Sequence, residues 1–234
     1  MNDNNGYDPL AHLEEGNGAG LLRLDFRQAM DDCDRALLAA GARVDQAIRP
    51  MTEAFLGGDT RTAEKLVQAD QIIDQGCQQL EERCFLLIAQ QSPVAGDLRR
   101  LIAVIKCVQD VSRSGDLLRH VGESLTWIHP PSLPTKHRET VQQLGDVSQD
   151  LFARGLQSWD EQDALAANEL EQDDDQVDLL QKVLLTDLYT GAQSVEESFS
   201  LALIARYYER IADHGVEIAR QTAYVVTGER APVG

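Results

Sequence analysis

Hydrophobic residues recur at the helical period along almost the whole chain, and no stretch shows the alternation of a half-buried β-strand. Glycines interrupt the pattern at Gly57, Gly58 and Gly191, where helices can end. The sequence therefore predicts an all-α protein. Six long helices are expected, at about residues 21–56, 59–91, 92–128, 135–158, 163–189 and 194–228.

Polar residues at three of these boundaries are typical helix caps. Asp59 or Thr60 can cap the second helix, since either side chain can accept a hydrogen bond from the first turn. Ser92 followed by Pro93 is a start signal for the third helix. The stretch S-V-E-E that begins at Ser194 predicts a capping box for the sixth.

Three prolines lie in the stretch H-P-P-S-L-P between the third and fourth helical patterns. Proline cannot continue a helix interior, and the helical pattern restarts after it. Long helices joined by short turns form antiparallel bundles, so we predict two tandem antiparallel three-helix bundles. The expected division is a disordered tail at 1–20, a bundle at 21–129, a Pro-rich linker at 130–134, a second bundle at 135–228 and a tail at 229–234.

The chain is strongly acidic, with 39 Asp and Glu against 21 Lys and Arg and a net charge of −18. Such a surface repels nucleic acid and anionic lipid, but attracts metal cations or a basic patch on another protein. Neither a membrane span nor a secretory signal is visible, so a cytoplasmic protein is expected. None of the four cysteines forms a C-x-x-C pair, and buried thiols are expected.

An acidic stripe lies in the last helical pattern, within Y-Y-E-R-I-A-D-H-G-V-E at 207–217. Glu209, Asp213 and Glu217 are spaced four residues apart, so a helix places them on one face. Each like-charged pair of this kind costs an isolated helix about 0.2–0.5 kcal/mol. A bound cation offsets this repulsion, so the acidic stripe can be one side of a cation-binding site.

Similar acidic pairs occur on two other expected helices, and a single acid occurs on a third. Asp174 and Asp178 lie on the fifth helix, Asp70 and Asp74 lie on the second, and Asp116 lies on the third. Chance alone supplies about six acidic pairs at this spacing, so one pair can be a solvated face. The pairs recur on the second and third helix of each half, however. This placement predicts that two acidic stripes converge within each bundle.

Two stretches give the chain a resemblance to a known family: Q-Q-S-P-V-A-G-D-L-R at 90–99 and A-R-Y-Y-E-R-I-A-D-H at 205–214. With the tandem three-helix plan, they resemble the PhoU family of bacterial phosphate-signalling regulators, over about residues 21–228. The resemblance implies two PhoU domains that each bind divalent metal, which is iron, zinc, manganese or magnesium. It also implies a negative regulator of phosphate uptake and of the phosphate-starvation response. The implied partners are the ATPase subunit of the phosphate ABC transporter and its sensor histidine kinase.

The resemblance also implies the metal ligands, and it does so unequally in the two halves. Ser112 stands where the family has an acid in the first half, so the second site is expected to hold metal more tightly. Glu217 lies outside the family motif and is a weaker candidate. The implied ligands are Asp174, Asp178, Glu209 and Asp213 in the second half, with Asp70, Asp74 and Asp116 in the first.

Four other polar residues lie near these motifs. His120, one turn beyond Asp116, can be a further ligand or a polar residue on a solvated face. His214 should point about 100° away from the stripe, so it is not expected to bind metal. Arg99 and Arg210 match family positions, and we expect each to pair with acids and hold helices in register. A single arginine amid this much negative charge is a poor anion site.

An enzyme is not expected. Di-iron enzymes built on long helices need Glu-x-x-His on two helices, and none of the five histidines has an acid three residues before it. No other catalytic signature is present in the sequence. The remaining alternatives are a carboxylate-bridged metalloprotein and a helical adaptor with no phosphate role. Exposed faces on long bundles make a homodimer plausible.

Overall fold

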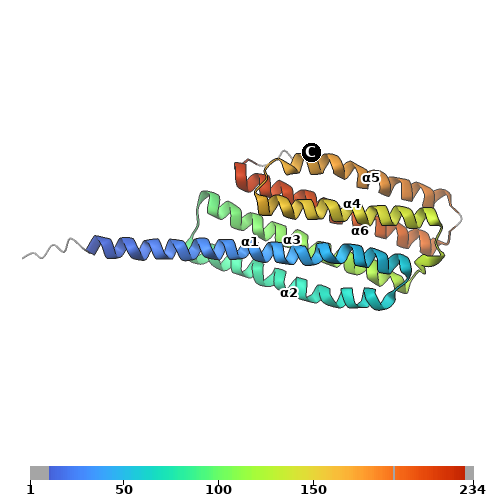
Figure 1. Cartoon of the computed structure of the whole chain (residues 1–234), viewed down its shortest axis with the longest axis horizontal. Coiled ribbons are helices and arrows are strands. Elements are labelled where there is room, and N and C mark those ends of the chain that lie inside the picture. The colour runs from blue at the N-terminus through green and yellow to red at the C-terminus, as the bar shows by residue number, and fades with distance from the viewer. Residues whose placement is uncertain (1–10, 192, 230–234) are drawn as a thin grey trace, which may run out of the picture.

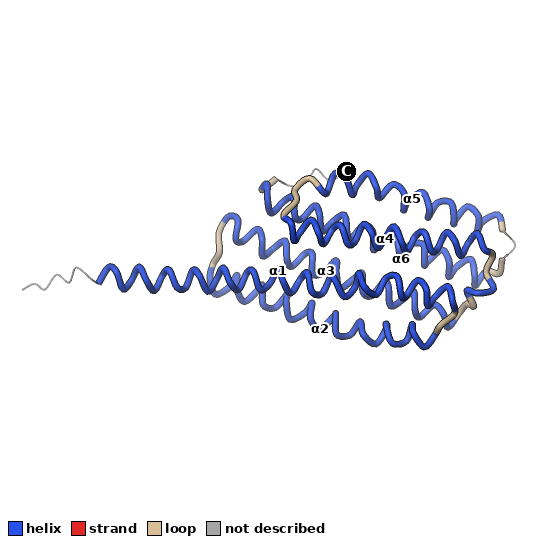
Figure 2. The backbone as a smooth tube through the Cα atoms, viewed as in Figure 1, coloured by secondary structure: helices blue, strands red, loops and turns tan. Residues whose placement is uncertain are grey.

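The computed structural model describes residues 11–191 and 193–229, with side chains described from Leu24 onward. It confirms the all-α prediction, and no strand occurs in these ranges (Figures 1 and 2). No helix in them is long and apolar enough to cross a membrane. The helices are α1 (Ala11–Gly57), α2 (Thr60–Gln91), α3 (Ala95–Glu123), α4 (Thr135–Glu161), α5 (Ala166–Thr190) and α6 (Val195–Thr227), with short 3-10 helices η1 (Ser124–Thr126) and η2 (Pro130–Ser132).

Helices α1 to α3 form one antiparallel bundle and α4 to α6 form the other, as predicted (Figure 1). The two bundles lie side by side along their lengths, because α1 packs along α4 and α3 packs along α6. The chain crosses from one bundle to the other at one end, through η1 and η2. The N-terminal part of α1 extends beyond the other helices (Figure 1).

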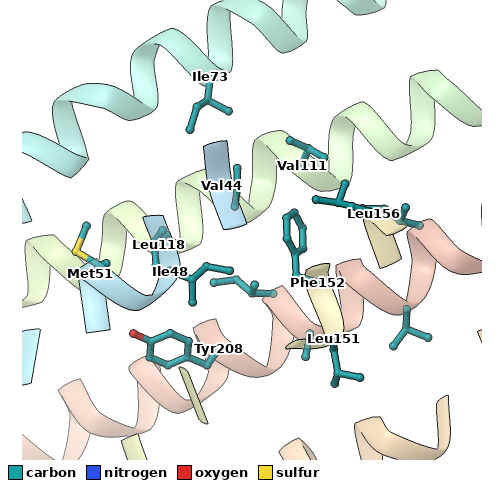
Figure 3. Packing of buried hydrophobic residues seen from close by; sticks show 14 of the residues in the cluster. Val44, Ile48, Met51, Ile73, Val111, Leu118, Leu151, Phe152, Leu156 and Tyr208 are labelled. Atoms are coloured by element: carbon teal, nitrogen blue, oxygen red, sulfur yellow. The ribbon is translucent and has the colours of Figure 1, made fainter. Parts of the chain in front are cut away.

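One hydrophobic core runs through both bundles. Figure 3 shows side chains from four helices meeting in it: Val44, Ile48, Val111, Phe152 and Tyr208. The hydroxyl of Tyr208 on α6 lies 2.7 Å from Oγ1 of Thr52 on α1, so a buried hydrogen bond also joins the halves. The four cysteines are buried and free, as predicted: Cys33, Cys77, Cys84 and Cys107.

Two glycines let α4 and α6 approach each other closely. A Cβ atom at Gly215 of α6 would lie 2.6 Å from the carbonyl oxygen of Leu151 on α4. A Cβ at Gly155 of α4 would in turn collide with the backbone of Gly215. These contacts involve backbone atoms, which cannot turn aside as a side chain can. They therefore determine where α6 and its acidic stripe lie.

Two of the predicted caps are present, and one is wrong. Asp59 accepts a hydrogen bond from the first turn of α2, and Ser194 forms the expected capping box. Ser92 instead takes a left-handed conformation with φ 45°, and its N–H donates to the carbonyl of Ile88 at 3.1 Å. It therefore closes α2. A residue in that conformation cannot also be the extended N-cap of the next helix, and α3 begins only at Ala95.

The disordered tail predicted at residues 1–20 overlaps the start of α1. Residues 11–20 belong to α1, while residues 1–10 lie outside the described part of the chain. Lengthening an existing helix adds one hydrogen bond per residue and needs no new nucleus. The glycines of this stretch disfavour the formation of a separate helix. They are tolerated as an extension of the long helix that follows. The predicted tail at 229–234 lies outside the described residues except for residue 229.

Candidate metal centre

The four acids of the second bundle lie on its second and third helices, as the sequence indicates. Asp174 and Asp178 are half-buried on α5, and Glu209 is buried on α6 with only 7% of its surface exposed. Asp213, one turn after Glu209, is exposed. α5 and α6 pack against each other as antiparallel neighbours. The two acidic pairs thus occupy neighbouring helices.

The carboxylates of α5 and α6 raise one another's pKa across the contact between the two helices. Burial raises the pKa of Glu209 to about 7, and the negative charge of Asp213 adds to the effect. Burial also raises the pKa of Asp174 to about 6, again with a contribution from Asp213. The pKa of Asp213 is raised too, because the surrounding protein still removes water from this exposed side chain. The structure brings the stripes of α5 and α6 together.

Two buried carboxylate oxygens of this cluster have no hydrogen-bond partner in the part of the chain that the structure describes: Oδ1 of Asp174 and Oε2 of Glu209. A buried charged oxygen without a partner is costly, at about 1–3 kcal/mol or more. A cation between α5 and α6 would satisfy both oxygens. Carboxylate oxygens are the ligands of hard divalent cations and of iron and manganese. The donor atoms of these side chains are therefore of the kind that suits a divalent metal ion.

Basic side chains already form ion pairs with two of the four acids of this cluster. Arg206 pairs with Oε1 of Glu209, and Nζ of Lys182 lies 3.1 Å from Oδ2 of Asp178. Among the described residues, no three acidic, histidine or cysteine side chains stand together as a ready metal-binding group. Binding a metal would thus require Arg206 and Lys182 to turn away and the carboxylates to turn inward.

The other two candidates on α6 face different partners. Glu217 accepts a hydrogen bond from Nε2 of Gln221 at 2.6 Å, so its carboxylate is engaged within its own helix. Nδ1 of His214 lies 3.0 Å from Oδ1 of Asp110 on α3. His214 thus points away from the acidic stripe, as the sequence indicates, and contacts the first bundle.

In the first bundle the acids of α2 and α3 also come together, but a hydroxyl takes part. Asp70 is buried and Asp74 half-buried on α2, opposite Ser112 and Asp116 of α3. The hydroxyl of Ser112 donates a hydrogen bond to Oδ1 of Asp74 at 2.5 Å. Burial raises the pKa of Asp70 to about 6, and the charge of Asp116 adds to this.

Arg119 supplies a cation to this first cluster. Its guanidinium lies 2.9 Å from Asp116, 3.6 Å from Asp70 and 2.7 Å from Glu123. The guanidinium of Arg119 thus already lies beside Asp70 and Asp116, which are two of the metal ligands that the family resemblance implies. With Ser112 in place of an acid and Arg119 beside Asp70, the first cluster fits a metal ion poorly.

Sequence reasoning missed Arg119, although a signal was present. Arg119 lies three residues after Asp116, which places it beside that acid on a helix. The corresponding position in the second half, three residues after Asp213, is Val216, which is buried and apolar. The second cluster therefore has no arginine at this position of the repeat.

Two further residues contact α6 rather than a metal cluster. The ring of His120 lies 5.5 Å from that of Tyr207, so it faces α6 and not the acids of the first bundle. The guanidinium of Arg99 lies 5.6 Å from the ring centre of Tyr224. Arg99 thus holds α3 against α6 through an aromatic ring instead of the predicted acid.

Comparison with known proteins agrees with this repeat. The family model described as the PhoU domain matches residues 37–125 and 141–222, one match in each bundle. The chain belongs to the PhoU family. This confirms the resemblance seen in the sequence.

Relatives in the family align with this chain over nearly the whole length of both proteins. The phosphate-specific transport system accessory protein PhoU homolog 2 of Mycobacterium tuberculosis is 32% identical over 210 residues, which cover 88% of this chain and 99% of that protein. PhoU homolog 1 of Methanothermobacter thermautotrophicus is 27% identical over 212 residues, covering 89% and 97%. Both are accessory proteins of phosphate-specific transport systems by name.

Solved structures of the family share the fold. PhoU from Pseudomonas aeruginosa superposes with a TM-score of 0.81 and 26% identity, over 87% of this chain and all of that one. The phosphate transport system regulatory protein PhoU from Streptococcus pneumoniae gives the same TM-score with 24% identity, over 89% of this chain. These matches support the two tandem bundles.

Proposed function

We propose that this PhoU-family chain restrains phosphate uptake and the phosphate-starvation response by binding other proteins. The partners proposed are the ATPase subunit of the phosphate ABC transporter and its sensor histidine kinase. The observation that carries the proposal is the family match in both bundles. It is supported by relatives that are named as accessory proteins of phosphate-specific transport systems and that align with this chain over nearly their whole length. The acidic surface supports contact with basic patches of partners.

Deletion of the gene tests this proposal in a strain that has no second copy of the family. Phosphate-starvation genes should then be expressed in phosphate-rich medium, and the intact gene supplied in trans should silence them again. Expression that stays low after deletion would contradict the regulatory role.

The second bundle supports a metal-binding part of this function. Asp174, Asp178, Glu209 and Asp213 would hold a divalent ion, which would neutralise their charge and link α5 to α6. The two buried oxygens without partners and the raised pKa values of Asp174 and Glu209 support this assignment. In the first bundle Arg119 provides a positive charge in place of an ion.

Location and assembly belong to the same proposal. The chain acts in the cytoplasm and meets the membrane only through its partners, and it forms a homodimer. Cell fractionation tests the first statement, and light scattering on the purified protein tests the second. Recovery in a different fraction, or a mass near the 25.9 kDa of one chain, would contradict them.

A further inference from the structure

An open cavity lies on the seam between the two bundles, where α3 packs along α6. Its volume is about 370 Å³, and Arg113 of α3 lines it together with Arg206 and Arg210 of α6. Three arginines in one cavity contrast with a chain whose net charge is −18. We call this cavity the arginine groove.

The internal repeat explains how two of these arginines meet. Arg113 follows Ser112 in the first bundle just as Arg210 follows Glu209 in the second. Because α3 and α6 are equivalent helices of the two halves and pack on each other, equivalent residues can face one cavity. The sequence alone shows Arg210 as a single arginine amid acids, whereas the fold places Arg113 and Arg206 beside it in the same cavity.

Two of the three guanidinium groups have no acid bound to them. Among the described residues, neither Arg113 nor Arg210 forms an ion pair, although Arg210 lies near enough to Asp213 to lower the pKa of that acid. Arg206 is held by Glu209. Like charges that line one cavity repel each other, and a bound anion removes this repulsion.

The other ionisable groups that line the cavity do not neutralise the positive charge of Arg113 and Arg210. Asp116, the acid that lines the groove, is already paired with Arg119 at 2.9 Å. His214, which also lines it, is paired with Asp110 at 3.0 Å. Among the described residues, the groove thus offers two guanidinium groups, those of Arg113 and Arg210, that are not paired with a carboxylate. Arginine forks suit the oxygens of phosphate groups, with two parallel hydrogen bonds for each pair.

A second cavity of about 360 Å³ continues along the same seam. Aromatic side chains line it, including Trp127 after α3 and Phe199 of α6, and the acids Glu123 and Glu196 line it as well. Tyr207 and the helices α3 and α6 are common to both cavities. The seam therefore has an arginine end and an aromatic end, and each is within the usual size of a small-molecule site.

We propose that the arginine groove binds a phosphate group. The group belongs either to inorganic phosphate or to a nucleotide whose base reaches the aromatic end and stacks there. This site is separate from the carboxylate clusters, and the proposal does not depend on metal binding or on protein partners.

Calorimetric titration of the full-length protein tests the proposal, with inorganic phosphate and ATP as separate probes at constant ionic strength. One saturable site per chain is expected for at least one probe. The double variant R113Q/R210Q should weaken binding at least tenfold. The matched control is R27Q/R61Q, which removes the same charge from two exposed arginines outside the groove and should retain wild-type affinity.

Tryptophan fluorescence distinguishes the two sources of phosphate. The chain has two tryptophans, of which Trp127 is 78% exposed at the aromatic end and Trp159 is 1% exposed in the core. A nucleotide should quench Trp127, and W127F should abolish the change. Inorganic phosphate should leave the signal unaltered.

Three results would overturn the proposal. The first is no saturable binding of either probe to the folded protein. The second is equal weakening by R113Q/R210Q and by the control, which would indicate only a general charge effect. The third is wild-type affinity in R113Q/R210Q with helical content intact by circular dichroism.

Discussion

At the scale of single residues, Arg119 and Val216 separate two otherwise related acidic clusters. They occupy the same position of the repeat, and only Arg119 can neutralise its neighbours. Buried carboxylates are stable only when a cation or hydrogen-bond donors accompany them. This position of the repeat thus supplies a cation to the first cluster and none to the second, where Arg206 and Lys182 pair with acids from other positions.

Replacing Arg119 by leucine should destabilise the protein by about 1–3 kcal/mol, because Asp70 would be left buried without its cation. Arg154 is the matched control: both arginines are 30% exposed, but the partners of Arg154 are exposed acids. R154L should cost less than about 1 kcal/mol. Urea denaturation measures both, and equal losses would contradict the role given to Arg119.

The raised pKa of Glu209 predicts a pH effect of definite sign. The pKa of the folded carboxyl is about 7, against an ordinary value of 4.5, so between these values the folded state binds the proton more tightly than the unfolded chain. Its contribution to stability is therefore lost as the pH rises from about 4.5 to 7. In metal-free buffer E209Q should be more stable than wild type at pH 8, by about 1–3 kcal/mol, and this gain should shrink at pH 4.5. A gain independent of pH would contradict the assignment.

At the scale of helices, the hydrophobic period predicted all six elements, and Ser194 and Asp59 showed where two of them begin. The sequence also indicated which acids share a helix face, since that follows from spacing alone. It could not show the role of Ser92, because the same residue suits the end of one helix and the start of the next. Nor could it show the arginine groove, which exists only because α3 packs along α6.

The close contact of α4 and α6 makes Gly155 intolerant of a side chain. An added Cβ would meet the backbone of Gly215, so G155A should cost about 1–3 kcal/mol through forced separation of the helices. At Gly76 of α2 a Cβ meets nothing within 4 Å, and G76A should stabilise the protein by about 0.5–1 kcal/mol. Thermal unfolding of both variants measures these opposite signs. A neutral or stabilising G155A would show that α4 and α6 are not packed as described.

At the scale of the whole molecule, the repeat places equivalent residues in unequal surroundings. Two bundles of the same plan share one core, and equivalent helices α3 and α6 form the seam between them. Among the described residues, the first cluster has Arg119 beside its buried Asp70, whereas the second cluster, in which Arg206 pairs with Glu209, still has two buried carboxylate oxygens without hydrogen-bond partners. The family fold is thus symmetric in outline, while the proposed chemistry is confined to the second bundle and the seam.

Elemental analysis of the purified protein and two matched variants tests this asymmetry most directly. Wild type is expected to hold about one divalent ion per chain, which is iron, zinc, manganese or magnesium. E209Q/D213N should lose it, whereas D74N/D116N, which removes the same charge from the first cluster, should retain it. Equal loss in both variants, or a wild-type protein that takes up no added divalent ion, would contradict the account.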